Sequence, residues 1–517
     1  MIKLLYTSSC SACFEKDNDL CYYSEAPYEI TIDGETVKKV TTNVFSLFNL
    51  RPSKTYRLGV VGSDFTLEFT TKKESVCVSA SSFLAKGDGK TDDTSALQTA
   101  INCLPEGGRL KIEKGVYLTA PLTLKSNVTI ELCKGAVILG VTDEKRYPVI
   151  PGEIKDCYSD KYLQCGTWEG IPKPMHQALV FGERVKNVNI VGEGVIDGNA
   201  QNSTWWQNVR ARKIGRPRLV FLNDCVNVTL HGVHGQNAAS WQFHPYFSKN
   251  ISFYDVSVSA PEVSPNTDGL DPESCDGVNI IGCRFSVGDD CIAIKSGKKY
   301  VADKYKKSAN RHVIRNCLME NGHGAITLGS EMSAGVKNLS VSRCVFFHTD
   351  RGLRIKTRRG RGRLAVIDGV SFENIEMTDV LTPIVINMYY YCCDPDRYGE
   401  YVWSREKLPI DDGTPRLGKF TFKNVVCKNC HVCAAYIDGL PEMPVEEVVF
   451  ENVAFDFAEN AKSGVPSMAT GVKKCSKKGA YFYGVKKLVL KNVTFKGVDG
   501  EKIITENVDE VVTENRP

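Results

Sequence analysis

From Val76 onward, short runs of alternating apolar and polar residues recur along the chain. Each run follows a small or polar residue, often asparagine, and the runs start near residues 127, 187, 227, 250, 277, 338, 369, 447 and 487. Alternation with a period of two predicts half-buried strands. The intervals start at 23 residues and almost no helix separates the runs, which indicates a stacked solenoid. We therefore predict an all-β protein in which residues 76–517 form a right-handed parallel β-helix.

One helix is expected near the start of this solenoid, in the segment GDGKTDDTSALQTAINCL (87–104). Asp92 or Asp93 can cap it, and an apolar stripe follows at Ala96, Leu97, Ala100, Ile101 and Leu104. The open end of a β-helix exposes unpaired strand edges. We expect the helix near 93–104 to cover that end.

Residues 1–75 have a different pattern, with short strands separated by turns, as in a small β-sandwich. The stretch LFNLRPSKTYRLGVV, with Leu50, Pro52 and Tyr56, resembles the fibronectin type III pattern. An irregular β-cap on the main domain is the alternative.

Composition narrows the class of protein. A net charge of +4 over 517 residues is too small to predict nucleic-acid binding, and no apolar run is long enough to span a membrane. If Met1 is the true start, the N-terminus lacks a signal peptide, so we expect a cytoplasmic protein. The 20 cysteines are scattered among valines and isoleucines, as free thiols in a core would be. The haem-like motif CKNCH (427–431) lies in a predicted strand, and we expect no cofactor and no metal.

Three carboxylates stand out among the strands: Asp268 in NTDG, and Asp289 with Asp290 in GDD. Asp268 and Asp289 are about one coil apart, so they can share a column on adjacent rungs. Carboxylates on one rigid wall suit glycoside hydrolysis, in which one acid protonates the leaving oxygen and another activates water. A calcium site or a solvated turn is the alternative.

The next coils add an imidazole and two cations. His323 lies between glycines in NGHG, and Arg354 and Lys356 are two residues apart on one face of a predicted strand. Two cations beside acidic groups indicate an anionic substrate, held through its carboxylate.

The motifs NTDG, GDD, GHG and RIK, in this order and at these intervals, resemble the signature of the polygalacturonases, family 28 of the glycoside hydrolases. The likeness extends from about Val76 to about Val498. It implies α-1,4-galacturonosidic hydrolysis with inversion, in which case the carboxyl groups would be roughly 6.5–9.5 Å apart. It also implies a galacturonate-containing oligo- or polysaccharide as the partner.

The resemblance also implies roles for individual residues. Asp289 would be the general acid, Asp268 and Asp290 would position and deprotonate water, and His323 would tune the acid or bind substrate. Arg354 and Lys356 would hold a galacturonate carboxylate. Tyr389 and His244 would contact substrate, with Tyr390 as the alternative to Tyr389.

The long insertion at 143–174 and the segments NTDGLDP and GSEMSAGV look more like the bacterial exo-acting members, so we expect exo action. The alternatives are a rhamnogalacturonan or xylogalacturonan hydrolase of the same family, a calcium-dependent β-helix pectate lyase, and a non-catalytic β-helix carbohydrate-binding protein.

Overall fold

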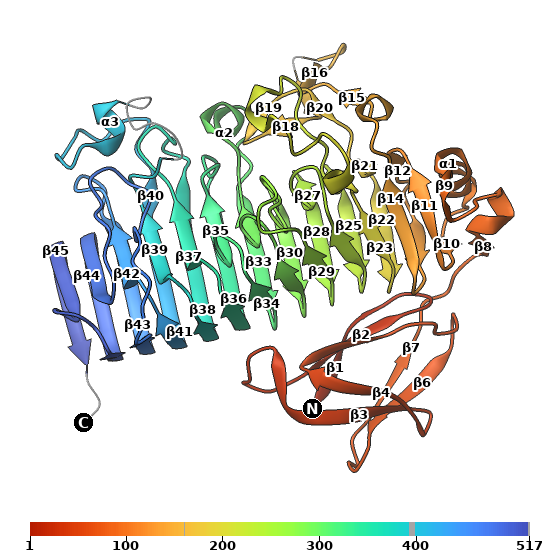
Figure 1. Ribbon diagram of the computed structural model, residues 1–517, viewed down its shortest axis with the longest axis horizontal. Coiled ribbons are helices and arrows are strands. Elements are labelled where there is room, and N and C mark those ends of the chain that lie inside the picture. The colour runs from red at the N-terminus through yellow and green to blue at the C-terminus, as the bar shows by residue number, and fades with distance from the viewer. Residues whose placement is uncertain (160, 392–398, 515–517) are drawn as a thin grey trace.

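The computed structural model describes residues 1–159, 161–391 and 399–514. A right-handed parallel β-helix forms most of the molecule (Figure 1), as the repeating runs predicted. Its longest series of strands pairs in parallel from one end to the other. This series is β8 (Cys77–Ser79), β10 (Gly108–Ile112), β13 (Val128–Leu132), β22 (Lys186–Gly192), β25 (Val226–His231), β28 (Lys249–Tyr254), β30 (Asp276–Ile281), β33 (Ala309–Arg315), β36 (Val336–Phe347), β38 (Val366–Thr378), β41 (Lys419–Cys430), β43 (Val445–Phe457), β44 (Lys478–Lys496) and β45 (Ile503–Glu514).

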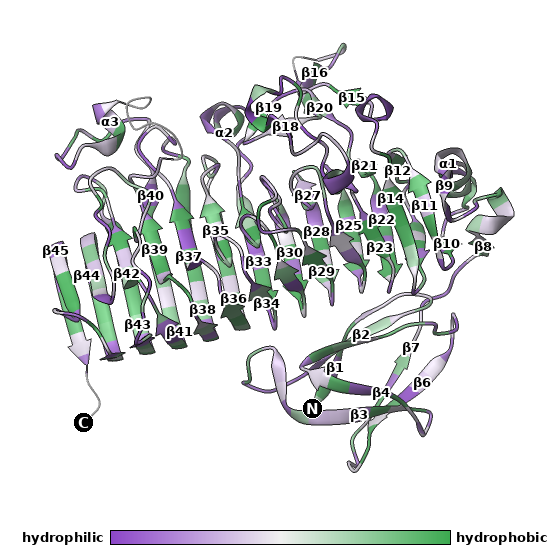
Figure 2. Ribbon diagram, in the orientation of Figure 1, coloured by the Kyte–Doolittle hydropathy of each residue, from purple (hydrophilic) through white to green (hydrophobic). Residues whose placement is uncertain are grey.

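A second series of shorter strands runs beside the first and joins it from β36 onward, where single long strands cover both positions. It contains β9 (Asp88–Asp92), β11 (Gly115–Thr119), β14 (Ala136–Gly140), β23 (Val195–Asp197), β26 (His234–Gln236), β29 (Ser257–Ser259), β31 (Arg284–Ser286) and β34 (Leu318–Glu320). Figure 2 shows apolar positions along the strands of the whole stack, which enclose one continuous core.

The third series carries the polar residues that the sequence singled out. It consists of β12 (Leu122–Thr123), β21 (Val180–Glu183), β24 (Val220–Asn223), β27 (Phe243–Tyr246), β32 (Ile292–Ile294), β35 (Ile326–Gly329), β37 (Arg351–Lys356), β39 (Thr382–Asn387) and β42 (Cys433–Asp438). Ile292, Ile326 and Leu353 are in register and buried in the core. Because side chains alternate along a strand, Arg354 and its neighbours in register face outward.

Asparagines stack along the outside of the coils, and this explains the residue that precedes so many strands. Asn127, Asn187, Asn227 and Asn250 have positive φ, a conformation that asparagine tolerates better than most residues. From Asn187 onward, each side-chain amide donates to the carboxamide oxygen of the asparagine one coil earlier, at 2.8 Å, 3.0 Å and 3.1 Å. The asparagines therefore form the corner and also connect successive coils.

The predicted helix is α1 (Thr94–Cys103), and it packs Leu97, Ala100 and Ile101 onto the first coils. Asp93 occupies the N-cap position, but its carboxylate accepts hydrogen bonds from the backbone of Lys86 and Gly87 instead of from the helix. The amide of Thr94 is satisfied by Asp92, at 3.0 Å. The short helices α2 (Lys299–Tyr305) and α3 (Glu400–Trp403) lie in loops beyond the third series (Figure 1). None of the helices in the described part of the chain has the length and apolarity needed to cross a membrane.

The N-terminal strands form two antiparallel sheets that share a small apolar core. One contains β1 (Ile2–Thr7), β2 (Ala12–Lys16) and β5 (Val44–Leu47), and the other contains β4 (Glu35–Thr42), β3 (Tyr23–Ile32), β6 (Thr55–Val60) and β7 (Thr66–Thr70). The likeness to fibronectin type III stays a prediction. The solenoid begins with β8, two residues beyond the end of the predicted N-terminal domain.

Buried polar contacts fix this N-terminal unit against the middle coils. The carboxylate of Glu15 is fully buried and contacts Arg315 at 2.6 Å and Arg343 at 3.1 Å. Burial alone would raise the pKa of Glu15, but these cations outweigh it and lower the pKa. A second contact joins Ser46 to His231, at 2.8 Å. The N-terminal unit is therefore held by charge as well as by packing.

Replacing Glu15 with alanine should destabilise the docking of the N-terminal unit by about 3 kcal/mol, because the two arginines would lose a buried partner. Urea unfolding, followed by hydrogen exchange in β2, measures the change. Asp17→Ala is the control, since Asp17 is exposed and 3.6 Å from the same Arg343; it should cost less than about 0.5 kcal/mol. Equal losses in the two variants would contradict the role given to Glu15.

Candidate active site

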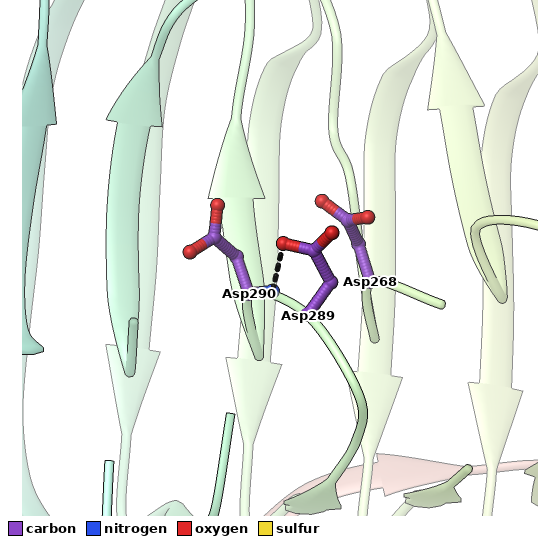
Figure 3. A group of neighbouring side chains, drawn as sticks. All are labelled: Asp268, Asp289 and Asp290. Atoms are coloured by element: carbon purple, nitrogen blue, oxygen red, sulfur yellow. Dashed lines mark hydrogen bonds between the residues drawn. The ribbon is translucent and has the colours of Figure 1, made fainter. Parts of the chain in front are cut away.

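The three aspartates lie together at the start of two neighbouring strand positions (Figure 3). Leu270 forms a bridge with Ile292, and the amide of Gly269 donates to the carbonyl of Asp290 at 2.9 Å. This register places Asp268 level with Asp290. The expected pairing of Asp268 with Asp289 is therefore displaced by one residue, because Asp289 lies in the turn before β32.

One carboxylate oxygen from each aspartate lies within 4.8 Å of the other two. The roughly 6.5–9.5 Å expected for an inverting mechanism is a separation between whole carboxyl groups, and it stays a prediction. A water molecule with hydrogen bonds of about 2.8 Å can contact two oxygens that lie within 4.8 Å of each other. Asp289 is half-buried, whereas Asp268 and Asp290 are buried, so Asp289 is the most accessible of the three.

Arg354 and Lys356 converge on Asp290. Lys356 Nζ is 2.7 Å from one carboxylate oxygen, and Arg354 Nη1 is 3.1 Å from the other. Burial alone would raise the pKa of Asp290, but the two cations outweigh it and hold the pKa well below its usual range. Asp290 is therefore held in its ionised form. The two cations contact Asp290 before any substrate is bound.

Asp268 has the opposite electrostatic environment. Burial, with further contributions from Asp271 and Asp289, raises the pKa of Asp268 well above its usual range. Lys295 opposes this only partly, because its Nζ is 3.8 Å from Asp268 and nearer to Asp271, at 3.4 Å. The site thus holds one carboxyl that favours a proton beside one that favours a charge.

Lys295, Asp271 and Glu331 were missed in the sequence. Lys295 Nζ lies 3.5 Å from Glu331 and 4.5 Å above the ring of Trp241. Burial would lower the pKa of Lys295, but Asp271, Glu331 and Asp268 raise it instead. A signal was present: Lys295 is two residues after Ala293 in IAIK, so it lies on the outward face of its strand.

His323 lies beside Asp289, since its amide donates to the carbonyl of Asp289 at 3.0 Å. Its side chain is 54% exposed, and Nδ1 is 2.9 Å from Asp350. The hydrogen bond to Asp350 is the main cause of the raised pKa of His323; burial opposes it, and Asp289 and Asp290 add to it. The imidazolium is therefore favoured at the accessible edge of the site.

Two predicted substrate contacts are not brought to the site. Tyr389 is 1% exposed and belongs to the core cluster, with Arg405 3.9 Å from the centre of its ring. Its strand ends at Asn387, so the alternation of side chains does not continue to Tyr389. The alternative, Tyr390, lines a narrow crevice with Arg354 and Lys356, and its ring centre is 5.8 Å from Lys356 Nζ.

His244 is fully buried behind the site. Its Nε2 is 3.2 Å from Glu273, and its Nδ1 accepts from Arg218 at 3.4 Å. Burial lowers the pKa of His244 well below its usual range, and Arg218 and Lys295 lower it further. His244 packs edge-on against Trp241, with ring centres 4.8 Å apart. It supports the wall of the site and does not face a ligand.

The insertion at 143–174 forms a wall beside Asp268. It contains the short strands β15 (Val149–Ile150), β16 (Glu153–Lys155), β17 (Tyr162–Gln164), β18 (Thr167–Trp168) and β19 (Ile171–Pro172), and β20 (Met175–His176) follows directly after it. Trp168 stacks on Trp241 with ring centres 6.4 Å apart, and the guanidinium of Arg218 lies near both rings, at 4.7 Å and 4.0 Å. Glu153 accepts hydrogen bonds from Lys304 and Tyr305 of α2 at 3.0 Å and 2.5 Å. The wall is therefore held in place by contacts at two points, Trp168 and Glu153.

Within the described residues, Asp268, Asp289 and Asp290 are the one group of three whose side chains converge as metal ligands would. All three offer oxygen, which suits a hard cation such as Ca²⁺ or Mg²⁺. Both oxygens of Asp290, however, already contact Arg354 and Lys356. Two positive groups at the third ligand disfavour a divalent ion, so the geometry fits the alternative of a calcium site poorly.

Asp350→Asn should lower the pKa of His323, because it removes the main interaction that raises it. The imidazolium would then lose its proton at lower pH than in the wild type. NMR titration of the His323 ring, assigned with His323→Gln, measures the shift. Asp379→Asn is the matched control, since Asp379 is 3.2 Å from another exposed histidine, His348. An unchanged His323 titration in Asp350→Asn would contradict the assignment.

Comparison with known proteins gives the same answer in sequence and in fold. Residues 163–468 match the model of the glycosyl hydrolases family 28. A probable polygalacturonase of Vitis vinifera is 30% identical over 407 residues, which cover 75% of each chain. An exo-poly-alpha-D-galacturonosidase of Dickeya chrysanthemi is 27% identical, over 72% of this chain and 66% of its own. A family 28 exopolygalacturonase of Yersinia enterocolitica has the same fold, with a TM-score of 0.72 and 20% identity over 100% of this chain and 98% of its own. The chain belongs to family 28 of the glycosyl hydrolases.

Proposed function

We propose that this glycoside hydrolase cleaves α-1,4-galacturonosidic bonds in polygalacturonate or its oligomers. The observation that carries the proposal is the arrangement of three aspartates beside two cations on one face of the solenoid. The relatives whose names specify galacturonan as their substrate support it. Because Arg354 and Lys356 together carry one more charge than Asp290, a uronate carboxylate has a cation available to it. A neutral sugar would leave that charge without a partner.

We propose that the reaction inverts the anomeric carbon. Asp289, the most accessible carboxyl, donates its proton to the leaving glycosidic oxygen as the bond from carbon to that oxygen breaks. Water attacks the carbon from the opposite face and gives its proton to Asp290, which the two cations keep ionised. Asp268 orients that water. The positively charged form of His323, beside Asp289, limits the negative charge that develops there when the proton leaves.

We further propose exo action that releases monogalacturonate. The support for it is the wall formed by the insertion, in which Trp168 stacks on Trp241 with Arg218, while Trp241 lies under Lys295 and Lys295 lies near Asp268. In this proposal the terminal sugar lies between the wall and the aspartates, and the wall blocks a continuing chain. Displacing the wall would break the hydrogen bonds that α2 donates to Glu153, so the wall stays in place.

Asp289→Asn should lower kcat by roughly 10² to 10⁴, because the amide keeps the shape of the side chain and cannot donate the proton. Reducing-sugar release from polygalacturonate measures the rate. Asp64→Asn, at an exposed position of the N-terminal unit, makes the same chemical change far from the site and should leave kcat unchanged. Retention of more than a tenth of the wild-type rate in Asp289→Asn would remove Asp289 from the role of acid.

Digestion of polygalacturonate should release monogalacturonate from the earliest time point, with the viscosity of the solution falling slowly. The terminal position of the wall is the reason, since internal bonds cannot reach the aspartates past it. Chromatography of early products with parallel viscometry makes the measurement. Mixed oligomers with a rapid fall in viscosity would show an endo-acting enzyme. Activity that a chelator abolishes, with products that absorb in the ultraviolet, would instead show a lyase.

A further inference from the structure

The outward face of the third series continues past the aspartates toward the C-terminal coils. Arg354 is in register with Val385, Val385 with Tyr436, and Tyr436 with Tyr481 on β44. The rings of Tyr436 and Tyr481 stack with centres 5.1 Å apart and planes 25° apart. Both tyrosines are half-buried, so they present an aromatic surface two and three rungs beyond Arg354. At about 4.8 Å per rung, this surface begins roughly 10 Å from Arg354.

A hollow of about 210 Å³ lies over these two rings. Its other side is formed by the loop between β43 and β44, through Pro466, Val472 and Lys473. Pro466 also lines the crevice that contains Arg354, Lys356 and Tyr390. The hollow and the crevice therefore adjoin along a single loop, on the side of the aspartates away from the insertion.

The position of this loop is fixed by contacts to the site. The guanidinium of Arg351 donates to the carbonyls of Val465 and Pro466, at 2.7 Å and 3.1 Å. The side-chain amide of Asn387 donates to the carbonyl of Met468 at 3.0 Å. The loop therefore lies over β37 and β39. Because these contacts hold it there, the hollow is part of the folded solenoid.

The rim of the hollow is positively charged. Lys473 and Lys478 line it and are exposed, and neither forms an ion pair with a carboxylate in the described part of the chain. Glu506 lies nearby and accepts a hydrogen bond from the hydroxyl of Tyr481 at 3.3 Å, which orients the ring. Aromatic faces suit the C–H faces of pyranose rings, and ammonium groups suit uronate carboxylates.

We propose that Tyr436 and Tyr481, with Lys473 and Lys478, form a distal subsite. This subsite binds sugars of a uronate chain that lie several sugar units from the bond being cleaved. This inference rests on the proposed function and adds to it, because it specifies a preference for longer chains. A disaccharide that spans the aspartates and the Arg354–Lys356 crevice does not reach Tyr436, whereas a pentasaccharide does. The subsite selects a charged, unbranched chain that leads away from the wall.

Steady-state kinetics on galacturonate oligomers of two to five sugars test the proposal. The wild type should have a higher kcat/KM for the pentamer than for the dimer. Tyr481→Ala and Lys478→Glu should each lower the ratio of these two values by about three- to tenfold, through KM for the pentamer. Tyr481→Phe keeps the ring and should keep most of the ratio. Because Lys478 is exposed, Lys478→Glu should fold even if Tyr481→Ala does not.

Two control variants change the same residue types elsewhere. Lys491→Ala lies on the same strand β44 but pairs with Glu514, at 3.1 Å, and Tyr23→Ala lies in the N-terminal unit. Both should keep the wild-type ratio. A wild-type ratio near one, or variants that lose equal activity on dimer and pentamer, would overturn the subsite and leave the proposed function intact. Absence of cleavage of every oligomer by the wild type would overturn both.

Discussion

The parallel backbone hydrogen bonds between successive coils are the constraint on which this molecule depends. They set one spacing, about 4.8 Å, for every rung and one register for every strand of a series. Side chains that are distant in sequence therefore stand in columns, and the aspartates, the cations and the tyrosines occupy positions along the same face. The wall, the aspartates and the hollow over Tyr436 and Tyr481 therefore lie in one straight row along the solenoid, which suits binding of a linear polymer.

Charged side chains are concentrated on the coils next to the insertion. Lys295 lies among Asp268, Asp271 and Glu331, while Arg354 and Lys356 meet at Asp290. Each cation stabilises the ionised form of the carboxylates that it contacts, and burial opposes that form. The different balance at Asp268 and Asp290 is what allows two identical side chains, one rung apart, to hold protons differently. A rigid backbone is needed for such a difference, since small movements would let the cations shift between them.

The repeat pattern predicted the fold because alternation and turn residues are local properties, and stacking needs little else. The sequence also predicted that the aspartates, His323, Arg354 and Lys356 lie close together, since their motifs lie on strands or tight turns whose side-chain direction the pattern gives; their roles stay predictions. Spacing along the chain failed for Asp289, because it lies in the turn before β32, where the period of two does not apply. Tyr389 came from the family resemblance, and it lies in the core beyond the end of β39. The resemblance made His244 a substrate contact, but tertiary neighbours that the sequence does not reveal, Glu273, Arg218 and Trp241, bury it. Lys295 was missed because it lies outside the four motifs, although its position two residues after Ala293 places it on the same outward side.

The contact between Glu15 and Arg315 joins residues that are 300 positions apart. The ribosome therefore produces the N-terminal strands long before the coils on which they dock. Until β33 and β36 have formed, the carboxylate of Glu15 and the hydroxyl of Ser46 must be satisfied by water. The N-terminal unit has its own apolar core, so it can fold early, while the polar groups of its docking surface stay hydrated during synthesis. The docking surface also has an apolar part, where Cys13 and Val44 pack on Ile281, and the charged part limits the apolar area that the unfinished chain exposes before its partner coils exist.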